Sequence, residues 1–159
     1  SGPELAASAW EKIEVEGEQG QLGFYTAQDN TWTLARVTES GLSKLAQLAP
    51  EHSSDWQGLG VSILHRLVME NLLGLTNLPK PMYVHSVSEV IEGLQRGDSV
   101  GRDATGQMGA GGRVELACLV MPATVDHVRA ISEHNERMPA KSTYFYPKLL
   151  AGLVINPLS

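Results

Sequence analysis

Residues 59–75, LGVSILHRLVMENLLGL, carry the clearest helical pattern in the chain and constrain its fold most strongly. Apolar residues recur there at the spacing of one helical face, which predicts an amphipathic helix. Arg66 and Glu70 lie on the opposite side at a spacing that favours an ion pair, and Gly74 is a candidate stop. The main apolar stripe consists of Leu64, Val68, Leu72 and Leu75.

The segment before this helix has the composition of a β meander. Residues 12–17, 21–27 and 31–38 are rich in β-branched and aromatic residues, and turn-forming residues separate them. Residues 41–49 predict a short helix that Pro50 ends, followed by a loop. We expect residues 1–11 to be a disordered or edge segment, which suggests a piece of a longer protein.

The second half alternates strands and helices. "PMYVH" (residues 81–85) predicts a short strand, and Ser86 with Glu89 forms the S-x-x-E capping box of a helix over residues 87–96. Residues 114–121 are apolar and short enough for a buried strand. Thr124 is placed to cap a further helix, and residues 152–156 predict a last strand. The residues expected to face inward from the two helices are Val90, Ile91, Leu94, Val125, Val128 and Ile131.

This alternation favours βαβ units with right-handed crossovers over residues 82–156. Together with the meander, it predicts an α+β fold with a mixed sheet and one longer amphipathic helix. A hydrophobic content of 42% is sufficient for one core, so residues 12–159 are expected to form a single domain.

Charge and cysteine content exclude several classes of function. The net charge is −6 and the 12 basic residues are scattered, so we expect no duplex nucleic acid as a partner. Cys118 is the only cysteine and lies in an apolar run, which indicates a buried thiol and excludes a disulfide framework. The apolar runs are too short for a membrane span, so a cytoplasmic location is expected.

The glycine-rich stretch GRDATGQMGAGG, residues 101–112, invites a phosphate-loop interpretation. A Walker loop requires Lys followed by Ser or Thr at the start of a helix, whereas here Arg113 leads into a strand. The order of elements is also reversed relative to a dinucleotide-binding fingerprint. We therefore predict a flexible surface loop over residues 99–113.

The histidines show no metal-binding spacing, since His127 and His134 lie two helical turns apart and no H-x-x-x-H occurs. No metal site is expected. His85 differs from the others because it ends a predicted strand just before a capped helix, where anions collect. A histidine bonded to a backbone carbonyl is the structural alternative. No nucleophile elbow or paired-carboxylate motif is visible, so the fragment is not expected to act as an enzyme by itself.

The segment KSTYFYPK, residues 141–148, gathers lysines, hydroxyls and aromatics near the C-terminus. Its lysines and hydroxyls have the chemistry to donate to phosphate or carboxylate, and its tyrosines share a face in an extended segment. The alternative is structural: the aromatics cover the core and the lysines protect a sheet edge. The candidate ligand-binding residues are Lys141, Ser142, Thr143, Tyr144, Tyr146, Lys148 and His85.

The same residues resemble the bacterial family called domain of unknown function 1015. The family ends in a Met-Pro, a Lys-Ser-Thr, an aromatic pair before Pro-Lys, and a Gly-Leu-Val before Pro-Leu, as residues 138–158 do. Residues 63–75 and the Y-x-H of Tyr83 and His85 also resemble family segments, and the likeness covers roughly residues 20–158. The long glycine-rich loop departs from the family pattern.

The resemblance implies that this chain is the C-terminal half of a larger protein. The N-terminal half of the family carries Asp-Gly-His-His-Arg, a motif that looks like the phosphate-handling loops of sulfiredoxin and ParB-like proteins. Nothing in this chain matches that motif, so no catalytic residue carries over. Two hypotheses follow: a phosphate or nucleotide half-site that the missing half completes, or a structural module that docks within the protein or forms a homodimer.

Overall fold

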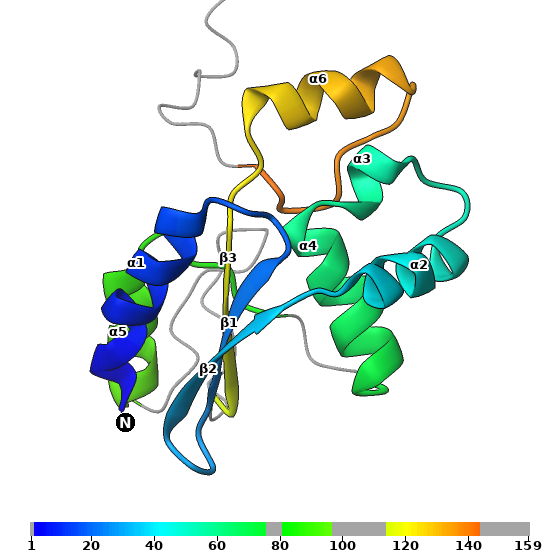
Figure 1. Cartoon of the computed structure of the whole chain (residues 1–159). Helices are drawn as coiled ribbons and strands as arrows, with labels where there is room; N and C mark the ends of the chain where they lie inside the picture. Colours follow the sequence, from blue (N-terminus) through cyan, green and yellow to red (C-terminus); the bar gives the residue numbers. More distant parts are fainter. Residues whose placement is uncertain (1, 76–80, 97–113, 144–159) are drawn as a thin grey trace, which may run out of the picture.

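The computed structural model describes residues 2–75, 81–96 and 114–143, and it confirms a mixed α+β fold (Figure 1). Strands β1, β2 and β3 form one sheet, and helices cover both of its faces. The strands are β1 (Gln21–Thr26), β2 (Thr31–Arg36) and β3 (Leu116–Val120). The helices are η1 (Pro3–Leu5), α1 (Ala6–Glu16), α2 (Glu39–Leu48), α3 (Ser54–Gln57), α4 (Gly60–Ser62), η2 (Ile63–Leu72), α5 (Val87–Arg96) and α6 (Val125–Glu133).

The sheet has the order β2-β1-β3, and both pairings are antiparallel. Among the described residues, β3 therefore joins β1 antiparallel instead of forming the parallel βαβ units that the sequence predicts. The strand predicted at residues 81–85 is wrong, because this segment has no regular structure. The strand predicted at residues 152–156 and the loop predicted at residues 99–113 lie outside the described residues.

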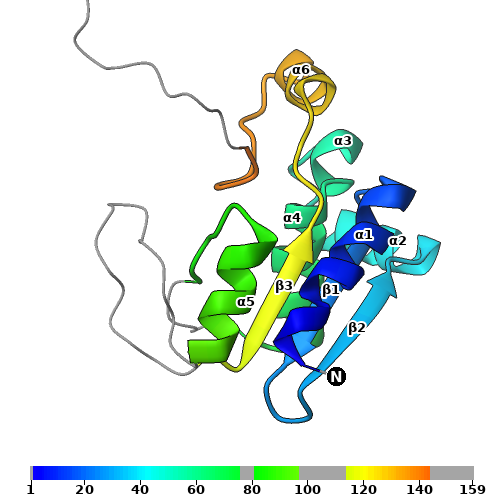
Figure 2. The ribbon, with the colours of Figure 1, turned by 90° about the vertical axis from the view of Figure 1, so that its left-hand side faces the viewer.

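An apolar layer packs on each face of the sheet. Figure 2 looks onto the face that carries α1 and α5. On one face, Ile13 of α1 packs with Ala9 and with Leu119 of β3. A Cβ on Gly23 would lie 3.1 Å from the Ile13 side chain, so the glycine permits α1 to approach the sheet closely. On the other face, the sheet packs against α2 and η2 through a cluster of Leu22, Leu45, Ile63, Leu64 and Leu67.

The N-terminal meander is a hairpin preceded by a helix. Residues 12–17, predicted as a strand, belong to α1 up to Glu16, and Gly17 ends the helix with a φ of 66°. Residues 3–11, which belong to the segment expected to be a disordered or edge segment, are helical too. The apolar residues Ala6, Ala9 and Ile13 have helical spacing and are all buried. Their burial against the sheet favours a helix over the predicted strand.

The other predicted helices are confirmed. Residues 60–72 are helical as α4 and η2, and the Leu73 N–H donates to the Val68 carbonyl five residues back, the pattern of a π-helix. At α5, the Ser86 hydroxyl accepts from the Glu89 N–H while the Glu89 carboxylate accepts from the His85 N–H. The predicted loop after residue 50 also contains the short helix α3.

Thr124 caps α6 as predicted, because its hydroxyl accepts from the His127 N–H. Ile131 faces inward and is fully buried. The prediction for Val125 is wrong: at the first helical position its side chain is 68% exposed.

Candidate functional site

Residues 139–142 form a tight turn at the start of the candidate ligand-binding segment. The Ser142 N–H donates to the Pro139 carbonyl at 3.3 Å, which closes a four-residue β-turn. The Ser142 hydroxyl donates to the same carbonyl at 2.7 Å. This buried hydroxyl uses its only hydrogen inside the turn, so the described geometry gives it a structural task.

Lys141 occupies the third position of this turn with a φ of +63°. This left-handed region favours glycine and costs an ordinary side chain about 1 kcal/mol. The other described non-glycine residues with positive φ are Asn30 and Asn135, whose short amides tolerate it. Lys141 is thus the one long side chain of the described part in this conformation, and it is exposed.

Contacts on both sides hold the turn in place. The Ser142 carbonyl accepts from the Ala123 N–H at 3.4 Å, which ties the turn to the segment between β3 and α6. Met138 packs against the apolar cluster that contains Trp56 and Ile131. The backbone that carries Lys141 is therefore fixed to the rest of the domain.

A polar clamp, made of His52, Ser53 and Glu136, fixes the chain just before the turn. One oxygen of the Glu136 carboxylate accepts from the Ser53 N–H at 2.7 Å. The other lies 3.3 Å from Nδ1 of His52, whose ring stacks on Trp56 with centroids 3.8 Å apart. Sequence reasoning missed this clamp because its partners are more than 80 positions apart and belong to no local motif.

A second histidine–carboxylate pair lies beside the clamp. Nε2 of His134 is 3.2 Å from Oδ2 of Asp55, and both side chains are about half exposed. Like the clamp, this pair joins the end of α6 to the region of α3. Two such pairs between the same segments orient α6 and the turn that follows it.

The clamp predicts a pH dependence of stability. Desolvation raises the pKa of Glu136, but the hydrogen bonds from Ser53 and His52 outweigh it and lower that pKa below its usual value near 4.5. A lowered folded-state pKa gives stability that is present above pH 4.5 and is lost as pH falls through the folded-state pKa. In urea titrations, we expect the stability difference between wild type and Glu136→Gln to be full at pH 6 and to shrink below about pH 4.5.

Glu133→Gln provides the matched control, because it removes an exposed carboxylate from the last turn of α6. If Glu136→Gln and Glu133→Gln have the same effect at every pH, the clamp does not stabilise the folded state.

The candidate residues divide between separate parts of the fold. Lys141, Ser142 and Thr143 lie together after α6, and Thr143 is half-buried. His85 is exposed before α5, a helix whose main contacts are with α1 and η1. Its backbone N–H serves the cap of α5. Tyr144, Tyr146 and Lys148 lie outside the described residues, so their place in a site stays a prediction.

Burial shifts the pKa values of two other side chains, Cys118 and His65. Burial raises the pKa of the Cys118 thiol to about 12, which keeps it protonated and unreactive. Desolvation also lowers the pKa of His65 below its usual value, so its neutral form is favoured. Across the described ranges, no three His, Cys, Asp or Glu side chains gather closely enough to hold a metal ion.

Comparisons with protein-family models, with curated proteins and with solved structures found no match for this chain. Within residues 2–75, 81–96 and 114–143, no helix combines the length and apolar character that crossing a membrane requires.

Proposed function

We propose that this chain is a ligand-binding module that contributes half of a phosphate or nucleotide site. In this proposal Lys141 supplies the charge and Thr143 a hydroxyl, with Tyr144, Tyr146 and Lys148 as further candidates. The other half comes from the N-terminal part of a larger bacterial, cytoplasmic protein of the domain of unknown function 1015 family. The sequence resemblance described above supports this parentage.

The observation that carries the proposal is the conformation of Lys141. A long cationic side chain stands exposed on a left-handed residue where glycine would be less strained. Strained backbone conformations that their surroundings hold in place concentrate at functional sites. Here the turn hydrogen bonds and the clamp hold the backbone, so the Lys141 side chain leaves the domain from a fixed point.

Lys141→Gly removes the charged side chain and keeps the backbone conformation of the turn, so it tests the charge alone. Glycine adopts the positive φ freely, and this gain offsets its larger entropy in the unfolded chain, so we expect stability within about 0.5 kcal/mol of wild type. A charge-assisted bond to phosphate contributes about 1.5–3 kcal/mol, so we expect binding of inorganic phosphate or ATP to weaken about tenfold or more. Calorimetric titration of the full-length parent protein with phosphate or ATP measures this change in affinity.

Lys44→Gly would disturb α2, so Lys44→Ala is the matched control for loss of one exposed lysine. It should leave ligand affinity unchanged. If neither phosphate nor nucleotides bind, or if Lys141→Gly binds them as wild type does, the half-site is rejected. The segment is then a structural or dimerisation module, which is the alternative that the sequence raised.

A further inference from the structure

Strand β2 is an edge of the sheet formed by the described residues. The Val37 N–H donates to the Gly20 carbonyl, and the register places Ala35 opposite Leu22 and Thr33 opposite Phe24. Hydrogen-bonded and non-bonded pairs alternate in an antiparallel ladder, so Ala35 and Thr33 bond towards β1. Trp32, Leu34 and Arg36 therefore direct their N–H and C=O groups away from β1, toward the open edge.

The edge lacks the features that usually prevent a strand from pairing. Its sequence TWTLAR has no proline, no lysine and no bulge, and the register with β1 is continuous over six residues. Residues 33–36 are exposed, so side chains on both faces of the strand are accessible. Such an edge accepts an additional strand through its main chain.

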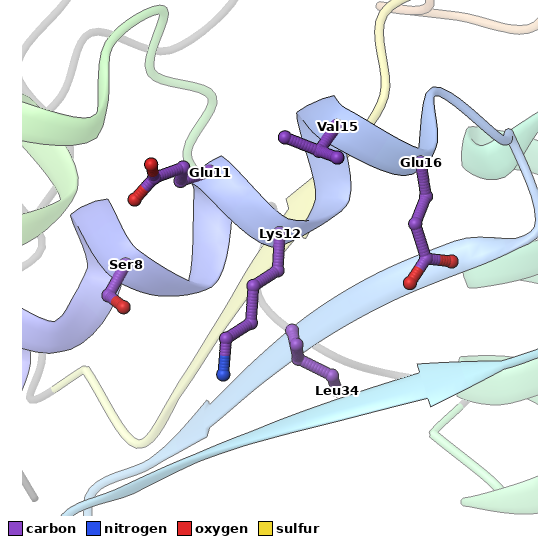
Figure 3. Close-up of a pocket in the computed structure, with 6 residues that line it drawn as sticks. All are labelled: Ser8, Glu11, Lys12, Val15, Glu16 and Leu34. Carbon is purple, nitrogen blue, oxygen red and sulfur yellow. The ribbon is translucent and has the colours of Figure 1, made fainter.

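A groove of ≈ 400 Å³ runs between α1 and β2 beside this edge (Figure 3). Lys12 and Glu16 extend from the helix toward the strand, with Leu34 below them. Val15, 81% exposed, and Leu34, 36% exposed, give the groove its apolar surface. An added strand would direct alternate side chains toward this groove, so apolar residues at every second position fit it.

The charge around the groove favours a partner segment of positive charge. Glu11, Glu16 and Lys12 line the groove, and Glu18 lies beside it in an ion pair with Arg36, so three acidic side chains face two basic ones. One basic residue, Arg36, forms ion pairs with both Glu16 and Glu18, so its charge is more than balanced. Two copies of this chain would bring like charges together at the edge, whereas a basic segment would meet the opposite charge.

We infer that β2 is a docking edge for a basic, extended segment of a partner protein, which adds to the sheet as a fourth strand. The main chain of that segment pairs with Trp32, Leu34 and Arg36. Its apolar residues enter the groove between α1 and β2, and its lysine or arginine residues face the acidic rim. This surface is separate from the turn at Lys141, so the two proposals stand or fall independently.

A short peptide that alternates valine and lysine is the probe. Amide hydrogen exchange should show that the amides of Trp32, Leu34 and Arg36 exchange rapidly in the free protein and become protected when the peptide binds. A peptide with glutamate in place of lysine should not bind. A peptide N-methylated on the amides of one edge should lose binding, because it cannot donate to β2.

Charge reversal on the protein tests the acidic rim. Glu11→Lys, in the groove, should weaken binding of the valine–lysine peptide about fivefold, and added salt should reduce the difference. Glu133→Lys reverses an exposed charge on α6 and should leave binding unchanged.

Three outcomes would overturn the inference. One is the absence of new protection at the three outward amides in saturating peptide. Another is equal affinity for the glutamate and lysine peptides. The third is protection that rises with protein concentration alone, which would assign the edge to pairing between copies of this chain.

Discussion

Ile13→Ala should lower the free energy of unfolding by about 3 kcal/mol, because it leaves a cavity in the layer between α1 and the sheet. Ile13 is fully buried and packs with Ala9 and Leu119. Val15→Ala, in the same helix, should change stability by a few tenths of a kcal/mol, since Val15 is 81% exposed and alanine favours helix. Urea denaturation of both variants measures the difference.

The Ile13→Ala and Val15→Ala variants also test whether the segment that contains both residues is a helix or a strand. In a strand, Ile13 and Val15 would lie on one face and their truncation would have comparable effects. In a helix they diverge by about 200°, so only one is buried. Similar losses of stability in the two variants would contradict α1 as the structure has it.

Gly60→Ala should destabilise the domain by about 2 kcal/mol, within the range for overpacking. A Cβ at this position would lie 2.7 Å from Cγ1 of Val120 and 2.9 Å from the Gln19 carbonyl oxygen. The Gln19 side chain also accepts from the Gly60 N–H and donates to the Pro122 carbonyl, each at 2.9 Å. The added methyl group therefore disturbs a junction among the start of α4, the approach to β1 and the end of β3.

A double-mutant cycle with Val120→Ala isolates the steric part. Removing the Val120 methyl groups should make Gly60→Ala less costly, although contact with the Gln19 backbone remains. Gly74→Ala is the contrasting variant: no atom of the described residues lies within 4 Å of its Cβ, but its φ of 65° costs about 1 kcal/mol. Additive effects of Gly60→Ala and Val120→Ala in thermal or urea unfolding would contradict the predicted clash.

Local patterns predicted several elements correctly because their causes lie within a few residues. Residues 60–72 are helical as their apolar spacing indicates, and Thr124 and Ser86 cap α6 and α5 through hydrogen bonds to backbone three residues on. The hairpin of β1 and β2 follows from two β-rich runs joined by a short turn. None of these assignments requires knowledge of a distant partner.

Residues 12–17 show where a local pattern failed. Ile13 and Val15 alternate with charged residues, which is the period of a strand, while Ala6, Ala9 and Ile13 have the period of a helix. Both patterns include Ile13. The sheet beneath decides between them, because Gly23 leaves room for Ile13 of a closely packed helix.

Local patterns in the chain were therefore enough to predict the α+β class, the helix at residues 60–72 and the helix caps. The packing of distant segments sets the antiparallel pairing of β3 with β1, the clamp between His52 and Glu136, the left-handed conformation of Lys141 and the position of β2 at the edge of the described sheet. The two groups of features differ in the sequence separation of the residues that cause them. Caps and periodic faces depend on neighbours along the chain, whereas strand order, clamps and edges depend on which distant segments pack together.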